Sequence, residues 1–573
     1  MDPESPLPDK LRAIARPSGI LFVIALTSAL FRFWNFLHWL IALYSALLLT
    51  PLLTCFWFRM VAVRRIGFRR LAWPDSKRLY GWTLLVIVSL TVFLYSLELW
   101  RGKWAYARLQ KEVQQQGGSL DLASIIPPPV PDAENFCATP LLAALVDFPE
   151  DSPWFLGTVE PKPSPDLDRV RAIVPSWVRR NDRNAWTRAE LTDFEARRDT
   201  MLLYTNQFGR MCSTNSAVAE IRKALTIFDP PLSELREAMN RPRSRWNLPF
   251  ESGWFVEIKT GPRNIARRAL IEVLNLRSVT YLASGNLDAA LADVELSLRL
   301  ADTLRGEPSF FSFAGRIELL RESLGPIWEG MARRQWSPDS LKRLQQRLEG
   351  FQLIADAKQQ SKGGSLIWMS FCREIDESLS IRNLLAHREQ LLASDRAPML
   401  WVGLAWKLHP TGWTYQNEVY AYRWFDPATR EATYLQTPVD PFNCFYFRPK
   451  LEETTRMISE IVPLLHLSIQ QGRVACALER YFLKHNSYPE QLSDLAPDWI
   501  ARIPVAGDST KPLLGYRKSS NGRFLLYPAT MTDVPEEYRP LDTETRSQRR
   551  QEEFGDSVWR YPVRQEPPAK PEA

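Results

Sequence analysis

The most informative stretch of the chain is residues 59–99, which read RMVAVRRIGFRRLAWPDSKRLYGWTLLVIVSLTVFLYSLEL. Seven arginines and lysines lie in its first twenty positions, whereas the run 81–99 at its end has Glu98 as its single charged residue. A helix needs about 20 residues to cross a hydrocarbon layer roughly 30 Å thick. The run 81–99 is therefore predicted to span a membrane, and the rest of the fold is expected to follow from that anchor.

Two further apolar runs precede it, at residues 18–34 and 38–58. Arg32, Asn35 and His38 interrupt these runs, as a tight hairpin at a headgroup boundary requires. We interpret the first hundred residues as an anchor of three transmembrane helices. An interfacial helix ahead of a single span is the alternative for the first two runs.

The arginine-rich loop sets the predicted orientation, because positively charged loops remain on the cytoplasmic side of a membrane. Lys10, Arg12 and Arg16 place the N-terminus on that same side. Three crossings then deliver everything after Trp100 to the opposite face. The sequence thus predicts a multi-pass protein of the cytoplasmic (inner) membrane with a large extracytoplasmic or periplasmic part. A cleaved signal peptide is disfavoured, since two more apolar runs follow the first.

The net charge of +7 divides unevenly along the chain. Residues 1–100 hold 11 Lys and Arg against 5 Asp and Glu, a net of +6, which leaves +1 for residues 101–573. Basic residues in the anchor serve orientation, and the large domain has no overall attraction for a polyanion. We therefore expect no nucleic acid among the partners, and we expect the lipid bilayer and a protein of the envelope instead.

Residues 101–136 are predicted to form a helical stalk and a spacer. The helix of the third span is expected to continue to the glycine pair Gly117-Gly118, which favours a helix end. The segment 127–131, Pro-Pro-Pro-Val-Pro, then predicts a semi-rigid extended spacer. A proline-rich ligand for a recognition module is the alternative interpretation of this segment.

Residues 137–450 are predicted to be a mainly helical extracytoplasmic domain, clearest in the helical hairpin at 264–304. Apolar residues recur at helical spacing over Asn264–Leu282 and Leu287–Leu304, with Asn286 as N-cap of the second helix. A third helix is expected to start at Ser337 and to stop at Gly350. The stretch Lys362-Gly363-Gly364-Ser365 is too short to cradle a phosphate, and we interpret it as a helix break.

Six residues of this hairpin fall at spacings that resemble one tetratricopeptide repeat: Tyr281, Gly285, Ala290, Val294, Ser297 and Asp302. The resemblance covers about 35 residues once and implies a closely packed helix pair. An ordinary helical hairpin is the alternative. Further on, aromatic residues cluster over Thr411–Thr437. Their stretch Arg423–Tyr434 suggests a β-hairpin, with the rings in the core rather than exposed for glycan or a partner.

Residues 451–531 are predicted to form a small α+β module. A helix runs from about Leu451 through Phe482, and Asn521-Gly522 is a strong turn signal between strands at Leu513–Lys518 and Arg523–Tyr527. The charged, proline-rich residues 532–573 are predicted to be a disordered tail. The fold class is therefore mainly α, with a small α+β module at the C-terminal end.

Parts of this module resemble the region that follows the N-terminal helix in type II secretion pseudopilins. The residues that carry the resemblance are Ala477-Leu478-Glu479-Arg480-Tyr481, Tyr488-Pro489, Leu492–Leu495, Lys511-Pro512-Leu513 and Tyr516. The resemblance implies a shared structural module of about 55 residues. The whole layout, including Pro131-Asp132 and Asn135-Phe136, is also similar to a group of large uncharacterised envelope proteins of Planctomycetes and Verrucomicrobia, which implies no particular activity.

The search for chemistry predicts no catalytic, cofactor-binding or metal-binding residues. His387, His409, His466 and His485 are the histidines beyond the anchor, and none belongs to a hydrolase or zincin motif. Glu374, Asp376 and Glu377 could supply paired carboxylates for glycoside chemistry, but a solvated acidic helix face explains them better. The cysteines, at 55, 137, 212, 372, 444 and 476, form no CxxC pair, and those after residue 100 allow at most two disulfides.

The leading hypothesis from the sequence is a non-enzymatic, membrane-anchored interaction or scaffold protein of the bacterial cell envelope. Two alternatives belong to other classes. One is an envelope hydrolase acting on glycan or peptide, and the other is an accessory component of a secretion or pilus-type assembly.

Overall fold

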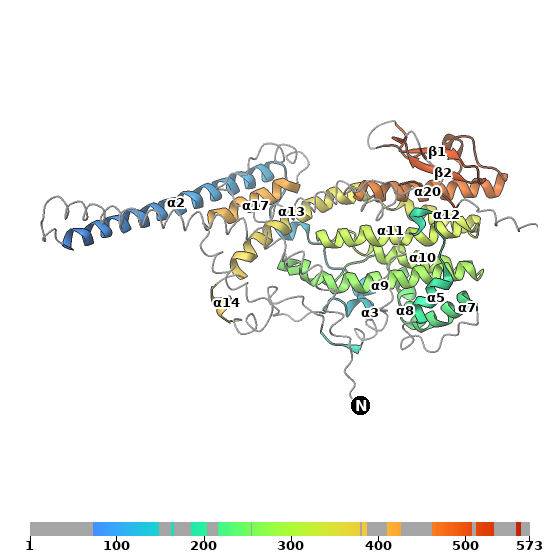
Figure 1. Ribbon diagram of the computed structural model, residues 1–573, viewed down its shortest axis with the longest axis horizontal. Helices are drawn as coiled ribbons and strands as arrows, with labels where there is room; N and C mark the ends of the chain where they lie inside the picture. Colours follow the sequence, from blue (N-terminus) through green and yellow to red (C-terminus); the bar gives the residue numbers. More distant parts are fainter. Residues whose placement is uncertain are drawn as a thin grey trace, which may run out of the picture. The chain divides into compact units, whose positions relative to one another are not determined.

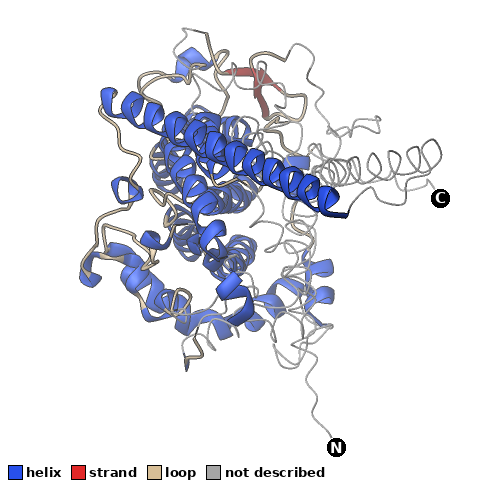
Figure 2. Cartoon of the chain, turned by 90° about the vertical axis from the view of Figure 1, so that its left-hand side faces the viewer, coloured by secondary structure: helices blue, strands red, loops and turns tan. Residues whose placement is uncertain are grey.

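The computed structural model describes residues 73–147, 162–165, 185–202, 216–253, 255–378, 381–386, 410–425, 461–506, 511–531, 534 and 557–562 (Figure 1). Helices make up nearly all of the regular structure in this part of the chain, with one small antiparallel sheet near the C-terminal end (Figure 2). The predicted mainly helical class is confirmed. The two predicted spans at 18–34 and 38–58 lie outside the described residues.

The chain divides into two compact units. The described residues of unit 1 are 73–125, 364–378, 381–386 and 410–425, and the remaining described residues form unit 2. The sequence predicts one helical domain over 137–450, but the structure divides this range between the units. Helix α13 (Leu353–Ser378) passes through the division, with Gly363 in unit 2 and Gly364 in unit 1.

Unit 1 is built on the 43-residue helix α2 (Trp73–Gln115). The helix ends where predicted, because Gly117 has a φ of 71° and so favours glycine. The predicted stalk is not bare, since α17 (Gly412–Phe425) packs against α2. In the β-hairpin suggested for Arg423–Tyr434, residues 423–425 are helical instead, and the rest of that stretch lies outside the described residues. The short helix α14 (Ile381–Ala386) completes unit 1.

Two glycines allow α2 and α17 to approach closely. A Cβ atom added to Gly102 would lie 2.2 Å from the carbonyl oxygen of Gly412. One added to Gly412 would lie 1.9 Å from the carbonyl oxygen of Glu98. Any larger side chain at either position must therefore push the two backbones apart. Helices α2, α13 and α17 supply buried apolar residues of unit 1, which include Leu109, Val113, Trp368, Phe371, Trp424 and Phe425.

Unit 2 is a set of packed helices around one apolar core. Helix α9 (Phe255–Ala283) packs against α10 (Leu287–Asp302) and α11 (Phe310–Ala332). Helix α12 (Pro338–Glu349) packs against α20 (Val462–His485). The smaller helices of this unit are α3 (Pro140–Ala143), α5 (Phe194–Leu202), α7 (Ala217–Leu225) and α8 (Asp229–Glu237).

The predicted helical hairpin is confirmed. Helix α9 begins earlier than predicted, and the turn after it contains Gly285 at a φ of 77°. The Asn286 side chain then caps α10 by accepting a hydrogen bond from the Ala289 amide. Helix α12 likewise starts with Ser337 as N-cap and Pro338 at its first position. These helix ends were predictable because each depends on residues adjacent in sequence.

The predicted helix and β-hairpin of the C-terminal module are also present. Strand β1 (Leu514–Lys518) pairs antiparallel with β2 (Phe524–Pro528), with Tyr516 opposite Leu526. Gly522 in the turn has a φ of 71°. This module does not stand apart, however, because α20 packs between its own sheet and helices α11 and α12. Its buried residues belong to the same core as the helices of unit 2.

Three shorter segments differ from the predictions. Helix α13 continues through Gly363-Gly364, where we expected a break. The Gly363 position needs a small residue instead, since an added Cβ would lie 3.0 Å from Pro308. The predicted spacer pairs with another segment of unit 2: Arg245 donates to the Pro127 carbonyl, and Asn135 bonds the Arg245 backbone. Residues 557–562, predicted to be disordered, pack onto the sheet.

Replacing Gly412 by alanine should loosen the contact between α2 and α17. The added methyl group overlaps the α2 backbone, and overpacking of this kind costs about 1–3 kcal/mol. We expect thermal unfolding of the purified protein in detergent to begin at a lower temperature. The control is Gly81→Ala in α2, where a Cβ would meet nothing within 4 Å. Equal stability of the two variants would contradict a close crossing.

Candidate functional site

The clearest functional surface is the apolar half of α2. Within the described residues, one helical stretch, Leu84–Gln115, is long and apolar enough to cross a membrane. Its apolar side chains from Leu84 to Leu97 are mostly exposed, including Val88, Val92 and Phe93. A folded protein does not leave such a surface in water, because its burial is worth about 25 cal/mol per Å². This surface needs an apolar environment.

Polar contacts begin at the point where the apolar run ends. Glu98 accepts hydrogen bonds from the Trp413 indole and the Gln416 amide of α17, each at 3.1 Å. It also pairs with Arg101 one turn later. Two turns further, Tyr106 of α2 meets Tyr415 edge to face at 5.8 Å. The apolar and the protein-covered parts of α2 thus join at Glu98.

Unit 1 also contains an ion pair between the buried Glu418 of α17 and the exposed Arg373 of α13. The two groups lie 2.9 Å apart, and Glu418 is 1% exposed. Burial raises the pKa of the Glu418 carboxyl to about 7, because the loss of hydration outweighs the attraction of Arg373. Glu418 therefore titrates near neutral pH, where most carboxylates are fully ionised.

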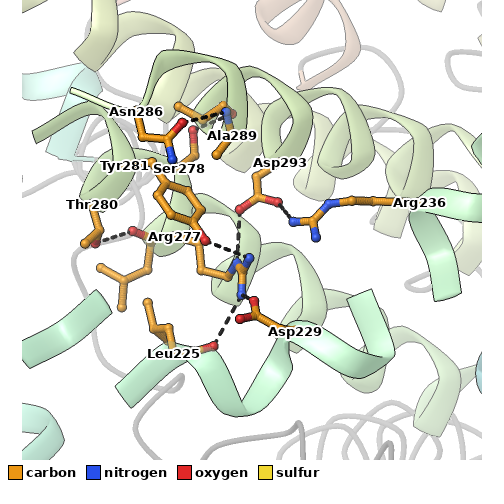
Figure 3. A network of polar contacts seen from close by, with 12 residues as sticks. Leu225, Asp229, Arg236, Arg277, Ser278, Thr280, Tyr281, Asn286, Ala289 and Asp293 are labelled. Atoms are coloured by element: carbon orange, nitrogen blue, oxygen red, sulfur yellow. Dashed lines mark hydrogen bonds and ion pairs between the residues drawn. The ribbon is translucent and has the colours of Figure 1, made fainter. Parts of the chain in front are cut away.

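A second network lies in unit 2 and joins helices α7, α8, α9 and α10 (Figure 3). Arg277 of α9 bonds the Asp293 carboxylate of α10 at 3.0 Å and the Asp229 carboxylate of α8 at 2.5 Å. Asp293 is 0% exposed and also pairs with Arg236 of α8. The Arg277 guanidinium further donates to the Leu225 carbonyl. Arg277 is 3% exposed and its partner Asp293 is fully buried, so we interpret this network as a structural clamp.

A third network surrounds Glu479 of α20. Its carboxylate accepts hydrogen bonds from the Tyr488 hydroxyl at 3.0 Å and from Arg523 of the sheet at 3.2 Å. Burial raises the pKa of Glu479, and Arg523 opposes this shift. Arg523 also donates to the Ala332 carbonyl at the end of α11. This acid joins the sheet to the helices and is closed to a substrate.

Among the residues that the sequence analysis considered for chemistry, the structure describes the side chains of His466, His485 and Glu374. His466 is half-buried in α20, where burial lowers its pKa, and His485 ends that helix beside the Tyr481 ring at 4.4 Å. Glu374 lies half-buried on α13. His387, His409 and the side chains of Asp376 and Glu377 are outside the described residues. Of the three acids considered for glycoside chemistry, the structure thus describes the side chain of Glu374.

The cysteines at 137, 372 and 476 are buried thiols. Burial raises the pKa of the Cys372 and Cys476 thiols well above its usual range, which keeps them protonated and unreactive. Among the described side chains, no three or more His, Cys, Asp or Glu residues are grouped to hold a metal ion. No family model, curated protein or solved structure matches the chain.

Sequence reasoning missed Glu418, Asp293 and Glu479, which carry the three buried networks. Each is a lone carboxylate on an otherwise apolar face of a helix, and that pattern is a usable signal for a buried acid. The arginine partner of Glu418 is 45 residues away in the sequence, and that of Glu479 is 44 residues away. Pairing at such separations depends on the tertiary fold and not on local spacing.

Replacing Asp293 by alanine should strongly destabilise unit 2. The change leaves Arg277 and Arg236 without their shared buried carboxylate, and breaking a buried pair costs about 3–5 kcal/mol. Urea unfolding monitored by circular dichroism would measure the loss. Asp288→Ala is the control, because Asp288 is exposed in the first turn of the same helix. If both variants lost less than about 1 kcal/mol, the clamp interpretation would be wrong.

The stability of unit 1 should depend on the ionisation of Glu418. Its folded pKa of about 7 lies above the unfolded value, so the folded state holds the proton more tightly. The resulting stabilisation, about 3 kcal/mol, is complete below about pH 4 and is lost as the pH rises through 7. Thermal unfolding of wild type and Glu418→Gln at pH 5 and pH 8 would test this.

We expect the Gln variant to lose less stability than wild type between these two pH values. Asp121→Asn is the matched control, since Asp121 is an exposed acid of the same unit. Identical pH profiles for wild type and Glu418→Gln would show that Glu418 does not titrate in this range.

Proposed function

We propose that this protein is a membrane-anchored interaction or scaffold protein of the bacterial cell envelope, with its large helical part on the extracytoplasmic side. The observation that carries the proposal is the exposed apolar surface of α2. A bilayer is the environment that covers such a surface on all sides of one helix.

The residues that follow the apolar run support a membrane boundary there. Trp100 and Trp104 are 64% and 57% exposed, and Arg101 and Lys103 lie beside them. Tryptophan and basic side chains collect at the headgroup level, where one end of the side chain is apolar and the other hydrated. Helix α17 begins to cover α2 at this same level, through Glu98.

The distribution of basic residues supports the proposed orientation. Seven arginines and lysines between residues 59 and 78 favour a cytoplasmic loop before α2, so the residues after Trp100 would lie outside the cytoplasm. The proposal includes this orientation and a three-span topology, in which the apolar runs at 18–34 and 38–58 join α2 in the anchor.

An interaction role is favoured over catalysis because the buried acids already have protein partners. Glu418, Asp293 and Glu479 each pair with arginine and hold one helix or strand to another. A general acid or nucleophile needs an approach for its substrate. The proposed function uses the surface of the folded domain instead of a buried site.

Placing arginines in the apolar part of α2 should change the topology of the chain. Val88 and Val92 are exposed on this helix, and each arginine near a helix centre costs about 2.5–3.5 kcal/mol of insertion. In the double variant Val88→Arg, Val92→Arg, a C-terminal alkaline phosphatase fusion should lose activity, because the domain stays in the cytoplasm. Val88→Leu, Val92→Leu is the control and should retain it. A fusion inactive in wild type would refute the orientation.

The interaction role itself is tested by crosslinking in intact cells, membrane solubilisation and affinity purification through a C-terminal tag. We expect the same envelope protein, or a second copy of this chain, in repeated purifications. Recovery of the tagged chain alone would count against a scaffold role and would leave the topology result unaffected.

A further inference from the structure

The C-terminal segment 557–562 is bound in the manner of a peptide ligand. Trp559 extends the small sheet by pairing with Leu526 of β2 through two backbone hydrogen bonds, of 3.0 and 2.8 Å. Addition of a strand to a sheet edge is a common way to bind an extended peptide. The β2 edge thus serves as the receptor for this segment.

Side chains of the surrounding helices donate hydrogen bonds to other backbone carbonyls of the segment. Gln471 of α20 donates to the Ser557 carbonyl at 2.7 Å, and the Trp328 indole of α11 donates to the Arg560 carbonyl at 2.8 Å. At the rim, the Asn521 amide donates to the Pro562 carbonyl at 3.3 Å. Side-chain donors to backbone carbonyls recognise an extended strand whatever its sequence.

Specificity comes from three consecutive side chains. Trp559, Arg560 and Tyr561 are 1%, 1% and 3% exposed. The Trp559 ring lies 5.6 Å from that of Trp186, and the Tyr561 ring stacks on Trp328 at 6.3 Å. Such buried aromatic anchors dominate the affinity of peptide interfaces. We name the site formed by β2, α11 and α20 the docking groove.

The connection to this segment is much longer than its path requires. Val534 and Val558 pack in one small apolar cluster with Leu525, so the connection leaves and returns at nearly the same place. Between them lie the 22 residues 535–556 plus Ser557, and 11 of those 22 are charged. Extended, 22 residues reach about 75 Å. The sequence therefore allows the docked segment to reach well beyond its own groove.

We propose that the docking groove also accepts residues 557–562 of a second copy of this chain, so that two copies are joined by exchange of their C-terminal segments. The proposal names a partner for the interaction role above and rests on it, since two copies must share one membrane. Within a chain, the covalent connection makes docking of the chain's own segment an intramolecular event with a high effective concentration. Exchange becomes competitive when membrane anchoring brings two copies equally close.

The experiment uses full-length chains that each carry one new cysteine at the rim of the groove. One copy carries Asn521→Cys and the other Pro562→Cys, and both positions are half-buried. The two copies are reconstituted together in phospholipid vesicles and treated with a short bifunctional maleimide. We expect a crosslinked heterodimer, which the wild-type mixture lacks. A single chain with both cysteines, which crosslinks internally, confirms that the variants fold and that the geometry is suitable.

A matched pair of changes tests the docking contact itself. Adding Trp559→Ala to the Pro562→Cys copy should lower the heterodimer yield at least about tenfold, as expected for loss of a buried aromatic anchor. Adding Glu566→Ala, beyond the docked segment, should not change the yield. If the doubly substituted chain crosslinks internally while the mixture gives no heterodimer, the exchange is overturned. That outcome leaves capture of other envelope proteins, and thus the proposed function, untouched.

Discussion

Ion pairs between arginines and carboxylates on different helices hold unit 2 together. Arg277 is held by Asp293 and Asp229, Arg316 by Asp302 and Asp356, and Arg268 by Glu322. An unpaired charge in a buried place would cost several kcal/mol, so these ion pairs favour the observed arrangement of the helices. Apolar packing alone would permit the helices to slide or rotate, whereas these pairs fix which helix faces which.

The elements that the sequence predicts well are those whose signals are local. Asn286 at the start of α10, Ser337-Pro338 at the start of α12, and Asn521-Gly522 between the strands each act within a few residues. The wrong predictions depend on distant neighbours. Gly363-Gly364 looks like a break until Pro308 is seen to occupy the space beside it. The tail 557–562 looks disordered because its aromatic anchor is short and lies between charged stretches.

The same contrast between local and distant signals applies to the candidate site. The apolar surface of α2 could be predicted because hydropathy is a property of consecutive residues. Helix α17, which covers the polar half of α2, could not, since the sequence separates Glu98 from Trp413 by more than three hundred positions. Gly102 and Gly412 carry the contact, and nothing near either glycine in the sequence indicates the other. The contact between α2 and α17 is thus one that only the fold reveals.

The buried thiols have a consequence for how the chain matures. Three of the five cysteines beyond the anchor are sealed in apolar surroundings, which leaves Cys212 and Cys444 as the one pair from which a disulfide could form there. The described parts of both units are therefore complete without oxidation. The folding of these parts needs no oxidase or disulfide isomerase, and reducing agents should leave them intact.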